Sequence, residues 1–195
     1  MHWAYDAIEK IKKMHLSHRN WNSALAEAHA MLISSSPGEV VCITGPSRAG
    51  KSRLIIALER LLVCGESFES NGEMLVAKVL ATNCSVGGTF SSKSFTLRAL
   101  DSLHHPFYSD NQTGNGAWCE EFYKRLARTP ETVLRPALEK ALKNRKTVYL
   151  FIDEAQHVLY SKGGKKDARA ILESWKCLAQ SAGCVLVLVG VRGSG

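Results

Sequence analysis

The 195-residue sequence lacks any long hydrophobic run. Its longest apolar stretches, such as CVLVLVGV at 184–191, are far shorter than the roughly 20 residues that a membrane-spanning helix requires. The N-terminal stretch MHWAYDAIEKIKKMH mixes acidic and basic residues and has no continuous apolar segment of the kind that a secretory signal needs. We therefore expect no membrane association, and the sequence predicts a cytoplasmic protein.

The six cysteines include no C-x-x-C pair, and their spacing gives no reason to expect a zinc site. Cys42 and Cys184 fall in expected strands, where we predict that each is a buried, reduced thiol that packs as a small hydrophobic side chain. Internal repeats and low-complexity segments are also missing. With 45% apolar residues, a chain of this length can form one well-packed core.

Positive charge is concentrated in the second half of the chain. From Lys124 to Arg169 there are twelve Lys and Arg against five Asp and Glu, and this difference of seven equals the whole net charge of +7. Such clustering suits a polyanion such as DNA or RNA, because phosphate contacts by lysine and arginine release condensed counterions. An ordinary solvated surface explains the same charge equally well. Charge alone leaves both interpretations open.

Hydrophobic periodicity predicts an α/β fold. Apolar residues at helical spacing indicate two amphipathic helices, at 3–14 and 21–32, in an N-terminal helical segment over 1–38. The core over 39–195 alternates strands with helices, and strands that are apolar on both faces are typical of a parallel sheet covered by helices on both sides. Thr129 and Pro130 look like an N-cap and a first-turn proline. The expected strands are 39–44, 73–82, 147–154 and 184–191, and the expected helices are 51–64, 92–103, 129–143 and 167–181.

The stretch GPSRAGKSRL at 45–54 satisfies G-x-x-x-x-G-K-[ST], the phosphate-binding loop. Gly45 and Gly50 allow backbone conformations closed to other residues, so that N–H groups converge on a β-phosphate. Lys51 can then reach the β- and γ-phosphate oxygens, the Ser52 hydroxyl can ligate Mg²⁺, and the following helix directs its positive dipole end at the same anion. The sequence predicts that ATP is bound by Gly45, Pro46, Ser47, Arg48, Ala49, Gly50, Lys51, Ser52 and Arg53.

Two acidic residues end the strand in VYLFIDEAQHV at 148–158. A phosphate-binding loop requires an acidic residue at the tip of another parallel strand, and Asp153 can hold Mg²⁺ there through its water shell. Glu154 can accept a proton from an attacking water, which is the requirement for hydrolysis; its alternative role is merely to begin the following helix. We therefore predict an ATP hydrolase in which Lys51 and Glu154 are catalytic and Ser52 and Asp153 hold the metal.

Three segments together resemble the AAA+ ATPases of the TnsC/TniB class, which assist transposases in transposon insertion: GPSRAGKSRL, VYLFIDEAQHV and ILESWKCLAQSAGCVLVLVG. The resemblance runs from about residue 39 to 190, and HLSHRNW at 15–21 resembles the segment that packs near the adenine in such proteins. It implies a P-loop NTPase fold of the AAA+/ASCE type. It also implies that the strand ending near Gly190 lies between the P-loop strand and the Asp153 strand.

The sequence departs from this family pattern in two places. Relatives usually carry Thr or Asn just after LVG to orient the attacking water, whereas this chain has Val191, whose side chain forms no hydrogen bond. Either Arg192 or Ser194 substitutes, or turnover is weak. The sequence also ends at Gly195, before the helix, the inter-subunit arginine, the fifth strand and the helical lid of the family, so we expect a fragment or a truncated chain.

By resemblance, such ATPases assemble on double-stranded DNA as ATP-dependent rings or helical filaments. Contacts with the DNA backbone then fall on Lys93, after the second strand, and on Lys162, Lys165 and Lys166, after the Asp153 strand. The glycines between these last lysines let the loop follow a phosphate backbone without reading bases, and a solvated loop is the alternative. The implied partners are double-stranded DNA, a transposase, target-selector proteins and further copies of the chain.

Three other side chains allow two interpretations each. His157 either relays the nucleotide state to the following helix or packs as an ordinary half-buried residue. Trp118 and Trp175 fit a core or an interface better than a platform for base stacking.

The preferred hypothesis is a DNA-associated AAA+ ATPase that serves transposition, in which ATP binding switches on assembly and hydrolysis releases it. A second hypothesis keeps the ATPase but gives it a protein assembly as substrate, as in secretion-associated ATPases with a similar IDEAQ element. A third is a non-hydrolysing module that binds ATP and recruits partners, which Val191 and the missing arginine and lid favour.

Overall fold

The sheet is parallel and lies in the middle of the molecule. The computed structural model describes residues 19–63, 72–81, 88–108 and 126–191. Within them four strands pair in the order β1-β4-β3-β2, so the expected position of the last strand between the P-loop strand and the Asp153 strand is confirmed. Because all three pairings are parallel, the carboxyl ends of the strands lie at one edge. The strands are β1 (Val40–Gly45), β2 (Val76–Leu80), β3 (Tyr149–Asp153) and β4 (Val185–Val191).

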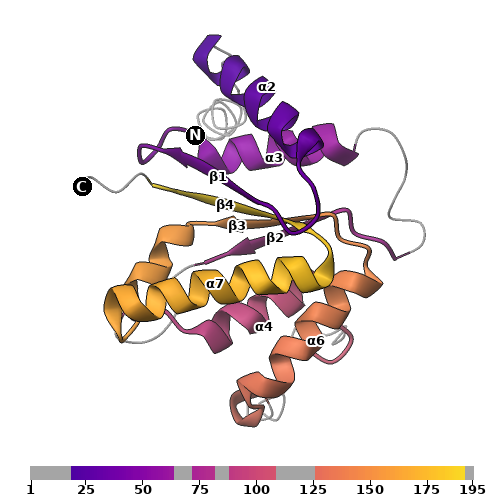
Figure 1. Cartoon of the computed structure of the whole chain (residues 1–195), viewed down its shortest axis with the longest axis vertical. Helices are drawn as coiled ribbons and strands as arrows, with labels where there is room; N and C mark the ends of the chain where they lie inside the picture. The colour runs from indigo at the N-terminus through magenta and orange to yellow at the C-terminus, as the bar shows by residue number, and fades with distance from the viewer. Residues whose placement is uncertain (1–18, 64–71, 82–87, 109–125, 192–195) are drawn as a thin grey trace, which may run out of the picture.

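Helices cover both faces of the sheet, as Figure 1 shows. On one face lie α2 (Arg19–Ser34) and α3 (Lys51–Val63). On the other lie α4 (Ser92–Ser102), α6 (Glu131–Asn144) and α7 (Gly164–Ala182), and the 3-10 helix η3 (Ala155–Tyr160) connects β3 to α7. The expected α/β P-loop architecture is confirmed. The helix expected at 3–14 lies outside the described residues.

The alternation of side chains along β4 explains why the sheet needs cover on both sides. Leu186 packs among the residues of α4, α6 and α7, whereas Val185, Val187 and Val189 pack against α2 and α3. All four are at most 1% exposed. Burying a side chain of this size contributes about 1.5–3 kcal/mol, so the central strand is a main source of stability. None of the helices in the described part of the chain is long and apolar enough to cross a membrane.

The expectation of two buried cysteines is right for Cys184 and wrong for Cys42. Cys184 is fully buried just before β4, and burial raises the pKa of its thiol to about 11, which keeps it protonated. Cys42 is exposed, because Val41 turns toward α2 and α3 while Val40, Cys42 and Thr44 face the other side of β1. The helices on that side pack on the other three strands, so within the described residues one face of β1 has no helix over it.

Two helix starts also differ from expectation. The N-cap of α6 is Pro130, which has an extended backbone and makes no side-chain cap hydrogen bond. Thr129 therefore lies one residue too early to be the N-cap. Helix α7 begins at Gly164 rather than at 167, because Gly164 takes a positive φ of 63° that a glycine adopts without strain. Lys165 and Lys166 therefore stand in the first turn of a helix and not in a loop.

Candidate nucleotide-binding site

The loop between β1 and α3 contains two left-handed residues. Gly50 has a φ of +85°, which glycine adopts readily, and Arg48 has a φ of 62°, which costs a non-glycine residue about 1–2 kcal/mol. These turns bring the N-terminus of α3 to the sheet edge where β1 ends. The N–H groups of the first helical turn and the positive end of the helix dipole are both favourable for an anion at this place.

The Lys51 ammonium lies over this loop. Its Nζ donates hydrogen bonds to the carbonyl oxygens of Gly45 at 3.2 Å and Pro46 at 2.8 Å. Phosphate oxygens carry negative charge, so they attract an ammonium more strongly than neutral carbonyl oxygens do. The geometry fits a lysine that exchanges the loop carbonyls for a bound phosphate.

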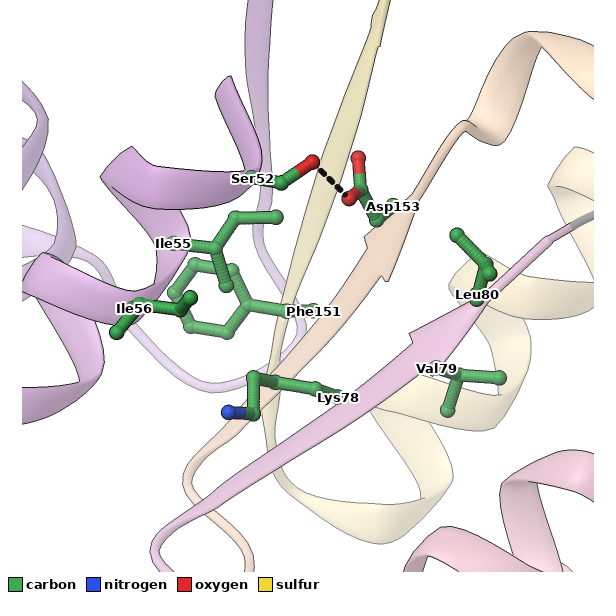
Figure 2. A pocket seen from close by; sticks show the side chains of 8 residues that line it. All are labelled: Ser52, Ile55, Ile56, Lys78, Val79, Leu80, Phe151 and Asp153. Atoms are coloured by element: carbon green, nitrogen blue, oxygen red, sulfur yellow. Dashed lines mark hydrogen bonds between the residues drawn. The ribbon is translucent and has the colours of Figure 1, made fainter. Parts of the chain in front are cut away.

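Ser52 and Asp153 meet across the sheet edge although 101 positions separate them. The Ser52 hydroxyl donates to Asp153 Oδ2 at 2.8 Å, and Figure 2 shows the two side chains pointing toward one another from α3 and β3. A hydroxyl and a carboxylate are the hard oxygen donors that Mg²⁺ prefers. The residues present therefore fit the metal that the sequence predicts, with the hydroxyl on α3 as a ligand and the carboxylate at the end of β3 placed to hold its water shell.

Glu154 follows Asp153 in a strained backbone conformation. Its φ of 56° and ψ of 35° lie in the left-handed region, and its N–H donates to Asp153 Oδ1 at 2.9 Å. Non-glycine residues in this region cluster at functional sites, where surrounding contacts hold them. Its carboxylate is half-buried and lies 3.9 Å from His157 Nε2, and the His157 ring contacts Tyr160 edge-on. Both interpretations of His157 remain compatible with this position.

Sequence reasoning missed Gln156, which ties Glu154 to the tip of β4. Its Nε2 donates to Glu154 Oε2, and its Oε1 accepts the Val191 N–H at 3.1 Å. A Cβ placed on Gly190 would stand 2.6 Å from that same Oε1, so only glycine leaves room for the crossing side chain. The only sequence signals were the amide side chain just after the acidic pair and the glycine at the end of the last strand.

A pocket of about 240 Å³ lies beside the Ser52–Asp153 contact, between α3 and strands β2 and β3 (Figure 2). Its walls are mostly apolar, with Lys78 at the side, where the ammonium pairs with Glu59. Pockets that hold small ligands are usually larger, about 300–1,000 Å³. An apolar space of this size does not fit a triphosphate, so the P-loop edge is the better candidate. The residues that line the pocket are Ser52, Ile55, Ile56, Lys78, Val79, Leu80, Phe151 and Asp153.

The lysines expected to contact DNA have different surroundings. Lys162, Lys165 and Lys166 are exposed at the start of α7, close in sequence to the end of β3. Asp167, in the same turn, is occupied in accepting the Gly163 N–H at 2.8 Å. Lys93 is half-buried, and its Nζ donates to the carbonyl of Ala127 at 2.6 Å, which makes it a link between α4 and the segment before α6.

The remaining predicted residues divide between the core and the undescribed part of the chain. Trp175 is 1% exposed and packs against Phe90 and Phe95, so it is a core residue as expected. Trp21 lies in α2, and its indole nitrogen is 3.9 Å from a Cβ placed on Gly50, which puts the end of the HLSHRNW segment next to the P-loop. Trp118, Arg192 and Ser194 lie outside the described residues.

The AAA domain family matches residues 35–194 of the chain. The chain belongs to this family. A Walker-type ATPase of Pyrococcus abyssi has a similar structure, with a TM-score of 0.54 and 11% sequence identity over 86% of this chain. The chain spans 44% of the length of that ATPase, and at this identity the likeness concerns the fold. No curated protein matches the sequence.

Proposed function

We propose that this AAA domain binds ATP with Mg²⁺ and hydrolyses it, and that nucleotide state controls its assembly on double-stranded DNA in transposition. The observation that carries the proposal is the 2.8 Å contact between Ser52 and Asp153, which joins the phosphate-binding loop to the acidic tip of β3. Lys51 lies one residue before this contact and Glu154 one residue after it. The groups needed for binding a triphosphate and for activating a water are thus gathered at one edge.

The residues divide the reaction among them. Lys51 exchanges the carbonyls of Gly45 and Pro46 for β- and γ-phosphate oxygens, and Glu154 accepts a proton from the attacking water. The Ser52 hydroxyl would ligate Mg²⁺ and Asp153 would hold it through its water shell, and the metal would supply positive charge to the phosphate oxygens. The Val191 side chain adds no hydrogen bond at the tip of β4, so we propose that turnover is slow.

The proposal of a DNA partner is supported by exposed charge at the same edge. Lys162, Lys165 and Lys166 stand at the N-terminus of α7, where the partial positive charge of the helix adds to theirs. They can contact a phosphate backbone without reading sequence. The Lys93 ammonium must leave the Ala127 carbonyl before it can contribute, so we assign it the smaller share.

The proposal of assembly and of a role in transposition has a different basis. The role rests on the resemblance of the P-loop, IDEAQH and LVLVG segments to the TnsC/TniB class. For assembly with further copies of the chain, support comes from Leu159 and Tyr160 in η3, which are 54% and 56% exposed beside the candidate site. Large apolar side chains that remain exposed in a monomer are favourable contacts for a partner. The other partners that we propose are a transposase and target-selector proteins.

Two substitutions test the coupling of nucleotide to DNA. Lys51→Ala removes the ammonium, so we expect ATP binding to weaken by about 10- to 100-fold and ATP-dependent DNA binding to disappear. Glu154→Gln keeps the size of the side chain but not its basicity, so we expect ATP binding to remain, hydrolysis to fall by at least about 100-fold and the lifetime on DNA to lengthen. Fluorescent-nucleotide titration, phosphate release and filter binding of duplex DNA measure the three quantities.

Matched controls are Lys176→Ala and Glu173→Gln, which make the same changes at exposed positions of α7. Both should behave as the unaltered protein. DNA binding that is indifferent to ATP in every variant would reject the coupling, and ATP left intact by the unaltered protein over long incubation with DNA would favour a non-hydrolysing recruitment module. The observation that favours this second function, a non-hydrolysing module, is the apolar side chain of Val191 at the tip of β4.

A further inference from the structure

Gln156 joins the tips of β3 and β4 beside the candidate site. It belongs to η3, directly after β3, and reaches across to β4, the neighbouring strand. One end of its amide accepts the Val191 N–H at 3.1 Å, and the other end donates to the Glu154 carboxylate. The side chain therefore connects the proposed base with the backbone of the very residue whose side chain lacks a polar group.

The orientation of this amide is fixed by its partners. A backbone N–H can only donate, so the end of Gln156 that faces Val191 must be the oxygen. The NH₂ group then has to face Glu154, whose carboxylate can only accept when ionised. Neither bond can form with the amide turned over, so the two partners together fix which end of the amide faces the carboxylate.

Gly190 makes this bridge possible. It is buried in β4, and an added Cβ would stand 2.6 Å from Gln156 Oε1. The Gln156 side chain is the flexible member of this contact, so it is the part that would be displaced. The link from β4 through Gln156 to Glu154 therefore depends on a residue without a Cβ at position 190.

We propose that Gln156 is a positioning residue for ATP hydrolysis, which holds the Glu154 carboxylate through one oxygen and leaves the other free to accept the proton of water. This inference rests on the proposed hydrolysis of ATP. The amide supplies at the tip of β4 a polar contact that the Val191 side chain cannot make. Because Gln156 acts through Glu154, its loss should slow the chemical step while ATP still binds.

The experiment compares steady-state ATP hydrolysis in variants of the full chain. Gln156→Met keeps the length of the side chain without either hydrogen bond, and Gln156→Glu keeps an acceptor for Val191 but loses the donor to Glu154. We expect each to lower kcat by about tenfold or more, as misplacement of a catalytic group does, with KM and fluorescent-ATP affinity within about twofold of the unaltered protein. Gln180→Met, at an exposed position of α7, is the matched control and should change neither.

Gly190→Ala provides a second approach to the same contact. If it acts by displacing Gln156, the double variant with Gln156→Met should be no slower than the slower single variant, because both remove one link. Equal kcat in Gln156→Met and the unaltered protein overturns the inference and leaves ATP hydrolysis standing. A fall in ATP affinity that matches the fall in kcat, or full activity in Gln156→Glu, also overturns it. An unaltered protein that does not hydrolyse ATP overturns the proposed function, and this inference with it.

Discussion

Single residues at the candidate site are held in conformations that other contacts must maintain. Arg48 and Glu154 both take left-handed backbone conformations, at a cost of about 1–2 kcal/mol each. Glu154 is held by its N–H bond to Asp153 Oδ1 and by the Gln156 amide. His104 and Lys146 take similar conformations away from the site, but Arg48 and Glu154 are the two that lie beside the phosphate-binding loop and the acidic tip of β3.

His105 shows how one side chain makes the fold sensitive to pH. Its Nδ1 accepts the Phe107 N–H at 3.2 Å, and its ring lies 5.0 Å from the Tyr108 ring. Burial, and next the nearby Arg145 guanidinium, lower the pKa of His105 from its ordinary value of 6.5. A protonated Nδ1 cannot accept the Phe107 N–H, so the folded protein favours the neutral ring.

This gives a prediction for the free energy of unfolding. Because the pKa of His105 is lower in the folded than in the unfolded protein, the unfolded chain binds more protons as the pH falls through 6.5, and stability is lost below that pH. His105→Asn keeps an acceptor and does not titrate. Its free energy of unfolding should therefore fall less than that of the unaltered protein between about pH 7.5 and about pH 5.5.

Urea unfolding at several pH values measures this difference. The matched control is His104→Asn, at the exposed neighbouring position, where the positive φ of 50° also suits asparagine. It should retain the full pH dependence. Identical slopes for His105→Asn and the unaltered protein would contradict the prediction.

At the scale of elements, the end of α7 is fixed by a single glycine. Gly183 has a φ of +76°, and its N–H donates to the carbonyl of Ala179 at 2.9 Å. The next residue, Cys184, also donates to Ala179, at 3.0 Å, which closes the helix just before β4 begins. This turn sets where the central strand enters the sheet.

We expect Gly183→Ala to lower the free energy of unfolding by about 1 kcal/mol. No atom lies within 4 Å of an added Cβ, so the substitution introduces no clash. The left-handed backbone then costs the alanine protein about 1–2 kcal/mol. Part of this cost is offset because alanine lowers the conformational entropy of the unfolded chain. Gly183→Asn should cost less, since asparagine tolerates left-handed backbone. Urea unfolding of the three proteins checks the order, and an alanine variant as stable as the glycine protein would show that the turn carries no strain.

The sequence predicts elements well where periodicity and turn residues agree. The strands, the P-loop and the helix after it follow from apolar runs and glycines, and each lies near its expected place. The start of α7 does not follow, because the positive φ of Gly164 lets the helix begin among lysines that look like a loop. The exposure of Cys42 does not follow either, because it depends on which helices cover each face of β1.

At the scale of the whole molecule, the parallel sheet explains why the candidate site could be predicted from the sequence. It also explains why the contact of Gln156 with Val191 could not. Strand tips in a parallel sheet meet at one edge, so the P-loop and the acidic pair were expected to converge, and Ser52 and Asp153 do. Gln156 reaches Val191 over 35 positions through a short 3-10 turn, and no motif encodes that path. Periodicity specifies which residues face the core but not how a polar side chain crosses a neighbouring strand.

The charge of the whole molecule gives the last prediction. The net charge of +7 attracts any polyanion, so loss of affinity alone does not locate a DNA surface. Replacing Lys162, Lys165 and Lys166 together by alanine should weaken duplex binding and reduce the slope of log affinity against log salt by up to about three, one for each lost phosphate contact.

Replacing Lys140, Lys143 and Lys146 makes the same change in charge at exposed positions near the end of α6, toward the opposite edge of the sheet. This control should change the slope much less, because lysines that make no phosphate contact release no counterions from the DNA. Equal slopes in the two triple variants would mean that the DNA surface lies elsewhere.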